Sequence, residues 1–493
     1  MVGEPHRCEG RAGLDYLAAA QWPAEMGADP DPAAPVHPYQ ASRGGVPLPW
    51  PPSRPDPAAG GAVLLARLLR DSYGMSRLQW RAPAADVALL ARGRRQSPPR
   101  AMRPVPSGGG KYPCDLYLET GGGDGIPAGR YAYDPVHHRL APLPSSGGGV
   151  GTGWRVYVVV ALDRNVGRYG DLGYRLHCLD AGALVGQVLA TAAGLGQPAT
   201  VHYHFPDAAL ASRLGLDPER EAVYAVVDIG RPSSTMEDLG STPARTGGRG
   251  RPVAWRTDAP ARLHAAAVRS DPRWSGRPVP SRPGLVRPDR TMALPEPDTS
   301  AVAPAVQRRS CEGQFSGAAI DARALATVLA AASAGVYSDI DGRPVTVLCV
   351  VNRVTGVAPG AYAYDPDRHA VGPRRTGDLR RAVQASLTPF VDGARAAAAV
   401  VMMTDFATMV SVRGDRWVRI LNMEAGIAAQ RVYRAAAAHG LAGQALCAFD
   451  QDRVGALFGV APAVLTPQIV VLVGGRRAVG SRLEQRLWDE SAS

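Results

Sequence analysis

The sequence predicts a mixed fold of helices and strands in which one domain occurs twice. A chain of 493 residues is too long for a single core. The hairpin around Tyr131 recurs around Tyr362, at an offset of 231 residues, and the strand that ends at Gly230 recurs as one that ends at Gly474, at an offset of 244. A period this long indicates a duplicated domain rather than a solenoid, and a homodimer fused into one chain is its simplest use.

The elements of the first copy follow from hydrophobic periodicity and from turn residues. Alternating apolar residues predict two strands of a hairpin, a β-branched run predicts a third strand, and glycines end the long helix and the last strand. The expected helices are 14–21, 63–70, 86–92 and 179–195, and the expected strands are 115–118, 130–133, 156–161 and 222–229.

The second copy repeats this order. The β-branched strand recurs at 398–403, and Glu424-Ala425-Gly426 opens a helix as Asp180-Ala181-Gly182 does in the first copy. The approach to the domain also recurs, because Leu48-Pro49-Trp50-Pro51 corresponds to Leu294-Pro295-Glu296-Pro297. Insertions totalling 13 residues separate the two copies, as the two offsets show.

Composition excludes several classes of protein. The net charge of +11 comes from scattered Arg residues in an Ala-, Gly- and Pro-rich chain, so we expect no nucleic-acid partner. The six cysteines lie far apart, without the spacing of metal ligands. No carboxylate or cysteine lies at metal-ligand spacing from the histidines, which include His137, His138, His177, His202 and His204. We expect no metal. We find no signal core and no run near the ~20 apolar residues that span a bilayer, so we expect a reduced, cytoplasmic protein without a membrane segment.

The most distinctive stretch is Pro104 to Pro113, which contains three successive glycines and runs into an apolar strand. Such glycines cannot continue a helix, and they leave backbone N–H groups and a serine hydroxyl available at the start of the strand. The stretch is therefore a candidate cradle for an anionic ligand rich in hydroxyl groups. The alternative is an ordinary turn before a strand.

The order of elements resembles the nitroreductase superfamily and, more narrowly, the SagB-type (ThcOx-like) dehydrogenases, the FMN-dependent azoline oxidases of ribosomal-peptide biosynthesis. The words that carry the resemblance are PVPSGGGKYP, GIPAGRYAYDP, RYGDLGYRLHCLDAG and RRSCEGQF, and the likeness covers about 40–230 and 262–480. The resemblance implies an α+β, three-layer α/β/α fold that dimerises around FMN. A fused tandem is then an intramolecular pseudodimer.

We accordingly divide the chain into four parts. They are an N-terminal Pro-rich extension (1–60), a first nitroreductase-like domain (61–232), a linker and wrapping segment (233–303) and a second nitroreductase-like domain (304–480).

The resemblance places the FMN phosphate against the second half. Relatives hold the phosphate with an Arg-Arg-Ser motif and with basic residues after the last strand, and arginine supplies the forked, permanent charge that a phosphate requires. The second half contains Arg308-Arg309-Ser310 and Arg476-Arg477, whereas the first half has only Ser76-Arg77-Leu78 at the corresponding place.

The resemblance places the flavin cradle in the first half. The loop that reaches the flavin from the other protomer is intact as Pro106, Ser107, Gly108 and Gly109, but its second-half counterpart is Tyr337-Ser338-Asp339-Ile340, in which Asp339 would point an anion towards a flavin. The loop whose amides face the flavin in relatives contains Cys447 and Ala448; the first-half counterpart is 200–206. One complete site, and one FMN per chain, would result.

SagB-type enzymes carry a Lys-Tyr pair ahead of the long helix, and the matching pair here is Arg168-Tyr169. An Arg guanidinium is effectively never deprotonated, so Tyr169 is the proton-handling candidate and Lys111-Tyr112 in the Gly-rich loop is a second one. The alternative is that Lys111 is a surface lysine and that Tyr112 packs on the hairpin.

Three functions are consistent with the sequence. The first is FMN-dependent dehydrogenation of peptide thiazolines or oxazolines to thiazoles or oxazoles, with a modified precursor peptide as substrate and a cyclodehydratase or leader-binding protein as partner, because no leader-binding domain is apparent at the N-terminus. The second is an FMN-dependent reductase of nitro compounds or quinones that uses NAD(P)H. The third is a non-catalytic scaffold of a peptide-modifying complex.

Overall fold

The computed structural model describes residues 10–20, 44–52, 59–81, 100–144, 151–230, 253–270, 290–300, 302, 315–389, 391–477 and 482–487. The predicted helix 86–92 and the predicted phosphate-binding residues Arg308, Arg309 and Ser310 lie outside the described residues.

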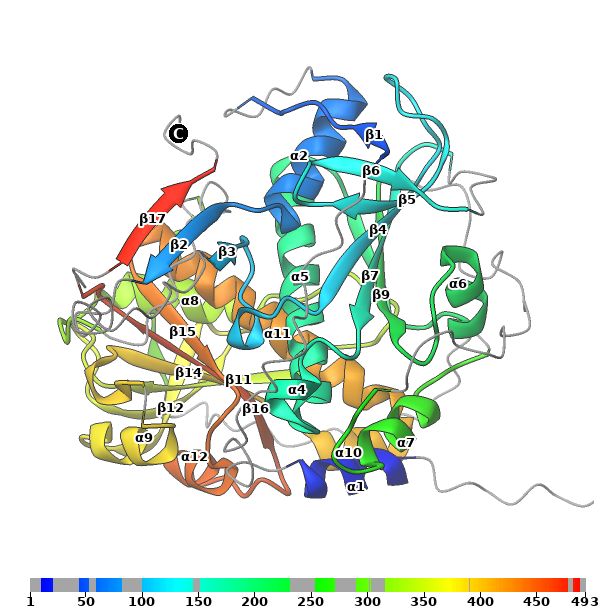
Figure 1. Ribbon diagram of the computed structural model, residues 1–493. Helices are drawn as coiled ribbons and strands as arrows, with labels where there is room; N and C mark the ends of the chain where they lie inside the picture. The colour runs from blue at the N-terminus through cyan, green and yellow to red at the C-terminus, as the bar shows by residue number, and fades with distance from the viewer. Residues whose placement is uncertain are drawn as a thin grey trace, which may run out of the picture.

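Two seven-stranded antiparallel sheets have the same strand order (Figure 1). The first has the order β1-β6-β5-β4-β7-β9-β8, with β1 (Val46–Pro47), β4 (Cys114–Thr120), β5 (Gly129–Asp134), β6 (Arg139–Pro142), β7 (Trp154–Ala161), β8 (Ala199–His202) and β9 (Glu221–Ile229). The second has the order β10-β13-β12-β11-β14-β16-β15, with β10 (Met292–Ala293), β11 (Val345–Val351), β12 (Gly360–Asp365), β13 (Ala370–Thr376), β14 (Ala398–Thr404), β15 (Ala442–Leu446) and β16 (Thr466–Gly474). The predicted duplication is therefore present in the fold.

Equivalent details recur at the hairpins of the two sheets. The Tyr131 hydroxyl donates to the Pro127 carbonyl oxygen (2.8 Å) and the Tyr362 hydroxyl to that of Ala358 (2.7 Å). The predicted match between 48–51 and 294–297 also holds, because the N–H groups of Leu48 and Leu294 donate to the equivalent carbonyl oxygens of the two hairpin turns, each at 3.1 Å.

Each sheet is covered by helices on both faces, as expected for a three-layer α/β/α domain. Strand residues alternate between the faces, so that in β11 Val347, Cys349 and Val351 join one core and Leu348 and Val350 join another. Helices α2 (Gly61–Tyr73) and α5 (Leu172–Gly194) cover one face of the first sheet, and α6 (Asp207–Leu214) covers the other. Helices α8 (Ala322–Ser333) and α11 (Arg416–Ala438) cover one face of the second sheet, and α9 (Arg380–Ser386) and α12 (Gln451–Leu457) cover the other.

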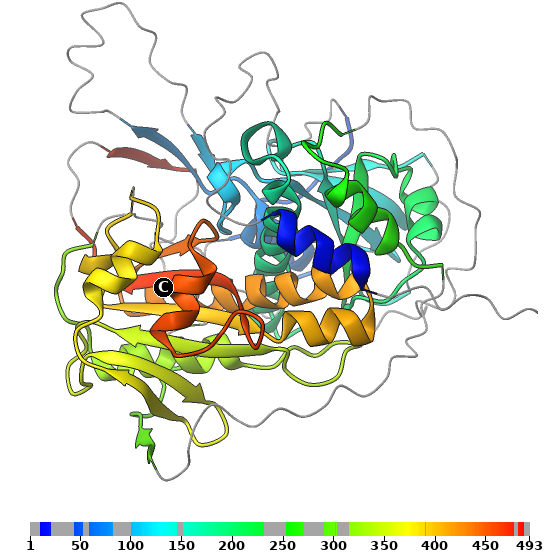
Figure 2. The same cartoon turned by 90° about the horizontal axis from the view of Figure 1, so that it is seen from below.

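The long helices α5 and α11 join the two halves, and both views show them side by side between the sheets (Figures 1 and 2). They cross at Gly182 and Gly426, which are equivalent in the repeat. A Cβ at Gly182 would overlap with the Met423 carbonyl, and a Cβ at Gly426 would overlap with the Leu179 carbonyl. Reciprocal contacts of this kind are typical of a two-fold dimer interface, here within one chain. The glycine of each Asp/Glu-Ala-Gly motif is thus required by the helix crossing.

Shorter elements cover this framework. Helices α1 (Arg11–Ala19), α4 (Val166–Tyr169), α7 (Ala259–Ala266) and α10 (Phe406–Arg413) lie near the ends of α5 and α11. The N–H of Gly13 in α1 donates to the Asp415 carboxylate at the start of α11 (2.6 Å). A third sheet has the order β17-β2-β3, with β2 (Arg77–Arg81), β3 (Arg100–Met102) and β17 (Arg482–Arg486). Through β17, the C-terminal part of the chain pairs with the first half.

The insertion in the second half lies between β13 and β14. Strands β7 and β14 already have the offset of 244, whereas the hairpins have that of 231. The additional chain forms α9 and the short helix η5 (Gly393–Arg395).

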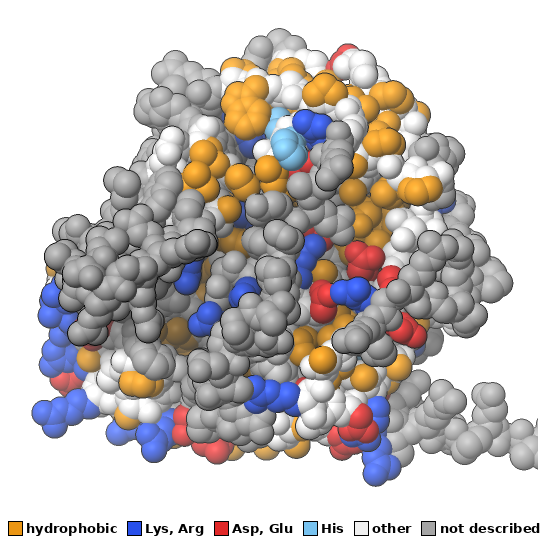
Figure 3. Space-filling model, viewed as in Figure 1, with side chains coloured by type: hydrophobic (Ala, Val, Ile, Leu, Met, Phe, Trp, Pro, Cys, Tyr) orange, Lys and Arg blue, Asp and Glu red, His pale blue; other side chains and the backbone are white. Residues whose placement is uncertain are grey.

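Composition led us to expect no membrane-spanning segment and scattered basic residues. Helix α5 is long and apolar enough to cross a bilayer, contrary to the expectation that no segment approaches this length, but it is mostly buried in the protein core. On the face shown in Figure 3, described Lys and Arg side chains lie among Asp and Glu side chains.

Candidate functional site

A cavity of about 230 Å³ lies between the two halves. The first half contributes the Gly-rich loop, Tyr169 and one side of α5; the second half contributes α11 and the loop after β15. The lining residues are Pro106, Ser107, Gly108, Gly109, Tyr169, Leu172, Leu176, Leu179, Asp180, Ala183, Thr388, Gly426, Ala429, Tyr433, Gln444, Ala445, Leu446, Cys447, Ala448 and Ile469. The structure thus brings the two predicted flavin loops to one cavity, although more than 300 residues separate them in the chain.

The Gly-rich loop is anchored by Asp180 of α5. The Ser107 hydroxyl donates to the Asp180 carboxylate (2.6 Å), and the Gly108 N–H donates to the same group (3.1 Å). The Ser107 oxygen also accepts from the Tyr112 N–H (2.8 Å). The sequence predicts that this hydroxyl and these amides are available to a ligand, and for the Ser107 hydroxyl and the Gly108 N–H this is wrong, because Asp180 binds both. Sequence reasoning missed this role of Asp180, although the repeated Asp/Glu-Ala-Gly motif pointed to the position.

Tyr169 contacts the same loop. Gly109 has a φ of 60°, and a Cβ at this position would overlap with the Tyr169 hydroxyl. Only glycine therefore allows the loop and the tyrosine to lie this close. Burial raises the pKa of Tyr169, and Arg168 opposes this effect in part. The Arg168 guanidinium carbon lies 5.5 Å from the Tyr169 ring centroid, and the Arg168 side chain is exposed. At neutral pH Tyr169 consequently keeps its proton.

The opposite wall contains the loop that follows β15. Within the described part of the chain, the N–H groups of Cys447 and Ala448 have no hydrogen-bond acceptor. Burial raises the pKa of the Cys447 thiol to about 12, so this thiol is neutral and a poor nucleophile at neutral pH. The two amides are available as hydrogen-bond donors to a ligand in the cavity.

Thr388 brings the second-half insertion to the cavity. This side chain is only 6% exposed. The segment around it is tied to the loop beyond Ala448, because the Asp450 N–H donates to the Ser386 carbonyl oxygen (3.0 Å) and the Arg453 guanidinium to that of Ala385 (2.9 Å). The sequence offered one signal for this wall, the difference of 13 residues between the two offsets.

The second proton-handling candidate lies elsewhere. Tyr112 is 2% exposed, its hydroxyl accepts from the Arg103 N–H (3.2 Å), and its ring packs edge-on against Tyr73. Among the described residues that line the cavity, neither Lys111 nor Tyr112 is present. This placement favours the interpretation of Tyr112 as a packing residue.

Two of the basic residues expected at the phosphate are described by the structure, and neither belongs to the cavity lining. Arg476 and Arg477 follow β16 and are exposed. Phe315 pairs with Arg476 in an isolated bridge, and the Ser316 N–H donates to the Gly475 carbonyl oxygen (2.9 Å). Phe315 and Ser316 therefore lie at the end of β16.

The residues around the cavity fit FMN in their donor chemistry. Among the described residues, the two amides without an acceptor belong to residues that line a largely apolar space, and the side chains of Leu176 and Tyr169 lie so close to Gly108 and Gly109 that a Cβ there would crowd them. Such a space suits a flat, mostly apolar ring with polar edges. No group of three or more His, Cys, Asp or Glu side chains that could hold a metal occurs in the described ranges.

Comparisons with known proteins agree with this fold. Residues 305–475 match the model of the Nitroreductase family, whose members typically bind flavin. A protein from Anabaena variabilis, named as a nitroreductase, has a solved structure that is 20% identical, with a TM-score of 0.75 over 94% of this chain and 99% of its own. That likeness extends over both halves. It confirms the predicted nitroreductase-like α+β fold.

Two further solved structures match about one half of this chain. A nitroreductase-named protein from Ralstonia eutropha is 19% identical over 42% of this chain and 98% of its own, with a TM-score of 0.33. A chain of the E. coli microcin synthetase McbBCD complex with truncated pro-MccB17 is 18% identical over 40% of this chain and 79% of its own, with a TM-score of 0.29. Neither likeness bears on function at these scores. No curated protein matches the sequence.

Proposed function

We propose that this protein is an FMN-dependent oxidoreductase with one site that both halves build. The observation that supports this proposal is the cavity in which the first-half loop 106–109 faces the second-half loop 444–448. Each half alone contributes only one of these walls.

In this proposal, different residues hold different parts of FMN. Pro106, Ser107, Gly108 and Gly109, held by Asp180, form one wall for the ring, and the amides of Cys447 and Ala448 donate to its polar edge. Arg308, Arg309 and Ser310, with Arg476 and Arg477, bind the phosphate, since guanidinium groups match its charge and geometry. When bound, FMN supplies the two-electron redox chemistry.

We further propose that the substrate is an azoline ring in a modified precursor peptide and that the product is the azole. The support is the resemblance of RYGDLGYRLHCLDAG and PVPSGGGKYP to the SagB-type dehydrogenases. The reaction removes two hydrogens from the ring; bound FMN would supply the two-electron acceptor, and this chain would supply the base that receives the proton. Because Tyr169 keeps its proton at pH 7, it would serve as the base only by relay, in which its own proton leaves to solvent water as its oxygen accepts the ring proton. A separate leader-binding protein delivers the peptide.

The raised pKa of Tyr169 favours a second candidate, reduction of a small electrophile such as a quinone or a nitro compound. Reduction needs an acid beside the acceptor, and a buried, protonated phenol is such an acid. NAD(P)H is the reductant in this case.

One experiment separates these functions. The purified protein is reconstituted with FMN, and its visible spectrum and released flavin are measured. It is then incubated under air with a synthetic thiazoline peptide, or with NAD(P)H and a benzoquinone. A product two mass units lighter supports azoline dehydrogenation. NAD(P)H oxidation that depends on the quinone, with no change in the peptide, supports reduction. A protein that binds no flavin contradicts both and favours the scaffold.

A further inference from the structure

The internal repeat generates a second crevice, and in the structure this crevice is closed. The repeat places 337–340 at the position of the Gly-rich loop and 201–204 at that of the loop with Cys447 and Ala448. In the cavity, the Gly-rich loop and the loop with Cys447 and Ala448 form separate walls. In the second crevice the equivalent loops bind each other directly: the Val201 N–H donates to the Tyr337 carbonyl oxygen (2.9 Å), and the Asp339 N–H donates to that of Val201 (3.2 Å).

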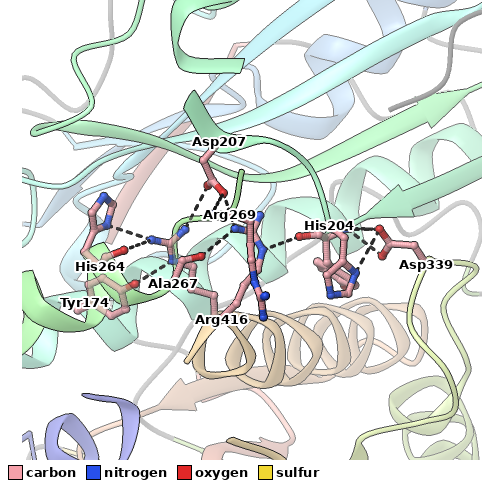
Figure 4. A network of polar contacts seen from close by, with 10 residues as sticks. Tyr174, His204, Asp207, His264, Ala267, Arg269, Asp339 and Arg416 are labelled. Carbon is pink, nitrogen blue, oxygen red and sulfur yellow. Dashed lines mark hydrogen bonds and ion pairs between the residues drawn. The ribbon is translucent and has the colours of Figure 1, made fainter. Parts of the chain in front are cut away.

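The Asp339 carboxylate completes this closure. It accepts from the Tyr203 N–H (2.9 Å) and from the His204 N–H (2.9 Å), and it lies 3.5 Å from the His204 ring nitrogen. Figure 4 shows the carboxylate directed at His204. Burial alone would raise the pKa of Asp339, but its bonds to His204 and to the two amides outweigh burial and lower it. Asp339 is therefore ionised at neutral pH.

These two amides are the repeat equivalents of the Cys447 and Ala448 amides. The same pair of donors is thus available in the cavity and bound to a carboxylate in the crevice. The sequence predicts that Asp339 would direct an anion towards a flavin, whereas in the structure it occupies the donors that a ligand would use.

Tyr203 fills the space beside this carboxylate. Its side chain is fully buried, and its hydroxyl donates to the Glu424 carboxylate (2.5 Å). Glu424 is the repeat equivalent of Asp180, which anchors the Gly-rich loop in the open cavity. The same acidic position therefore supports an open loop in one half and a filled crevice in the other.

A buried network holds the Tyr203 loop from behind. The Arg416 guanidinium donates to the Tyr203 carbonyl oxygen (2.7 Å), to the Asp207 carboxylate (2.6 Å) and to the Ala267 carbonyl oxygen (2.9 Å). The Arg269 N–H donates to Asp207 as well (2.8 Å). Figure 4 shows that Arg416, Asp207 and the end of the α7 segment meet beside His204. These contacts hold the loop in addition to those of Asp339, so we expect its amides to keep their direction when the aspartate is removed.

We infer that the Tyr203 and His204 amides form a carboxylate-binding site that the chain occupies with its own Asp339. A simple carboxylate from solution is the class of ligand that this site takes when the aspartate is removed. The crevice consequently takes no flavin. This last consequence rests on the proposed function, whereas the carboxylate site does not.

The test is chemical rescue of an aspartate deletion. Asp339→Ala should lower the Tm by about 3–6 °C, since it removes hydrogen bonds to an ionised group. Sodium acetate at 100 mM should restore at least half of this loss, whereas sodium chloride at the same ionic strength should not. Asp392→Ala is the matched control, because Asp392 caps the Arg395 N–H at an exposed turn (3.2 Å). Its Tm should respond equally to the two salts.

The outcomes are distinct. An equal response of Asp339→Ala to acetate and to chloride overturns the carboxylate site. Should Asp339→Ala fail to fold, Asp339→Asn serves instead, and a Tm equal to that of the unsubstituted protein overturns the inference. Two FMN molecules per unsubstituted chain would show that the crevice is open. Acetate rescue in a protein that binds no FMN leaves the carboxylate site intact and rejects only the proposed function.

Discussion

Replacing Asp180 with Asn tests whether the Asp180 carboxylate holds the Gly-rich loop in the conformation that binds FMN. The carboxylate accepts a 2.6 Å bond from the Ser107 hydroxyl and a 3.1 Å bond from the Gly108 N–H, and the residue is 9% exposed. Asparagine has nearly the same size, so the change removes the charge without creating a void. Hydrogen bonds to charged groups contribute about 1.5–3 kcal/mol each.

This loss should appear as weaker flavin binding. Without the Asp180 carboxylate, the loop must become ordered when FMN binds, and the free energy of this ordering weakens the affinity for FMN. If one charged bond is lost, the Kd for FMN should rise about 10- to 150-fold. Titration of the apoprotein with FMN, followed by quenching of flavin fluorescence, measures this change directly.

Glu424→Gln is the matched control. Glu424 occupies the equivalent position on α11, but its carboxylate accepts from Tyr203 in the closed crevice. This substitution should lower stability and leave the FMN affinity of the folded protein within about twofold of the original, a difference below ~0.5 kcal/mol. Equal losses of affinity in the two variants, or no loss in Asp180→Asn, would refute the assignment of the flavin to the Gly-rich loop.

Three further predictions concern proton transfer, phosphate binding and pH. Tyr169→Phe should retain FMN with an unchanged spectrum and lose about 100-fold in turnover, as expected for one acid–base group, whereas Tyr112→Phe should leave turnover intact; the reverse result would assign the proton to Lys111-Tyr112. Arg309→Ala should weaken FMN binding by about 10- to 150-fold, and Arg77→Ala should have little effect. Equal losses of affinity in the two variants would mean that the assignment of the phosphate site to the second half is wrong. Burial lowers the pKa of His264 to about 3, so the stability linked to this neutral ring is complete above pH ~6.5 and declines as the pH falls towards 3, by up to about 1.4 kcal/mol per pH unit. Urea denaturation between pH 7 and pH 4 should therefore show a shallower decline for His264→Gln, and an unchanged slope would reject the buried neutral histidine.

The sequence by itself determined the duplicated framework and the loops that meet at the site. The turns at 127 and 358, the closing glycines at 230 and 474 and the apolar alternation of the strands are local signals, because backbone conformation and strand periodicity depend on neighbouring residues. Since both copies follow the same pattern, their equivalence could be inferred without coordinates. The pairing of loop 106–109 with Cys447 and Ala448 was implied by the resemblance to the nitroreductase superfamily.

Only the tertiary structure decided which polar groups of these loops are available to a ligand. The bond between Ser107 and Asp180 joins residues 73 positions apart, and that between Tyr203 and Asp339 joins residues 136 apart. Both depend on where α5 and α11 cross and on how far apart the loops then lie, and sequence spacing contains neither quantity. The same two loop positions therefore leave a cavity on one side of the crossing and close around an aspartate on the other, because a carboxylate in the chain can satisfy buried amides wherever packing brings it within 3 Å of them.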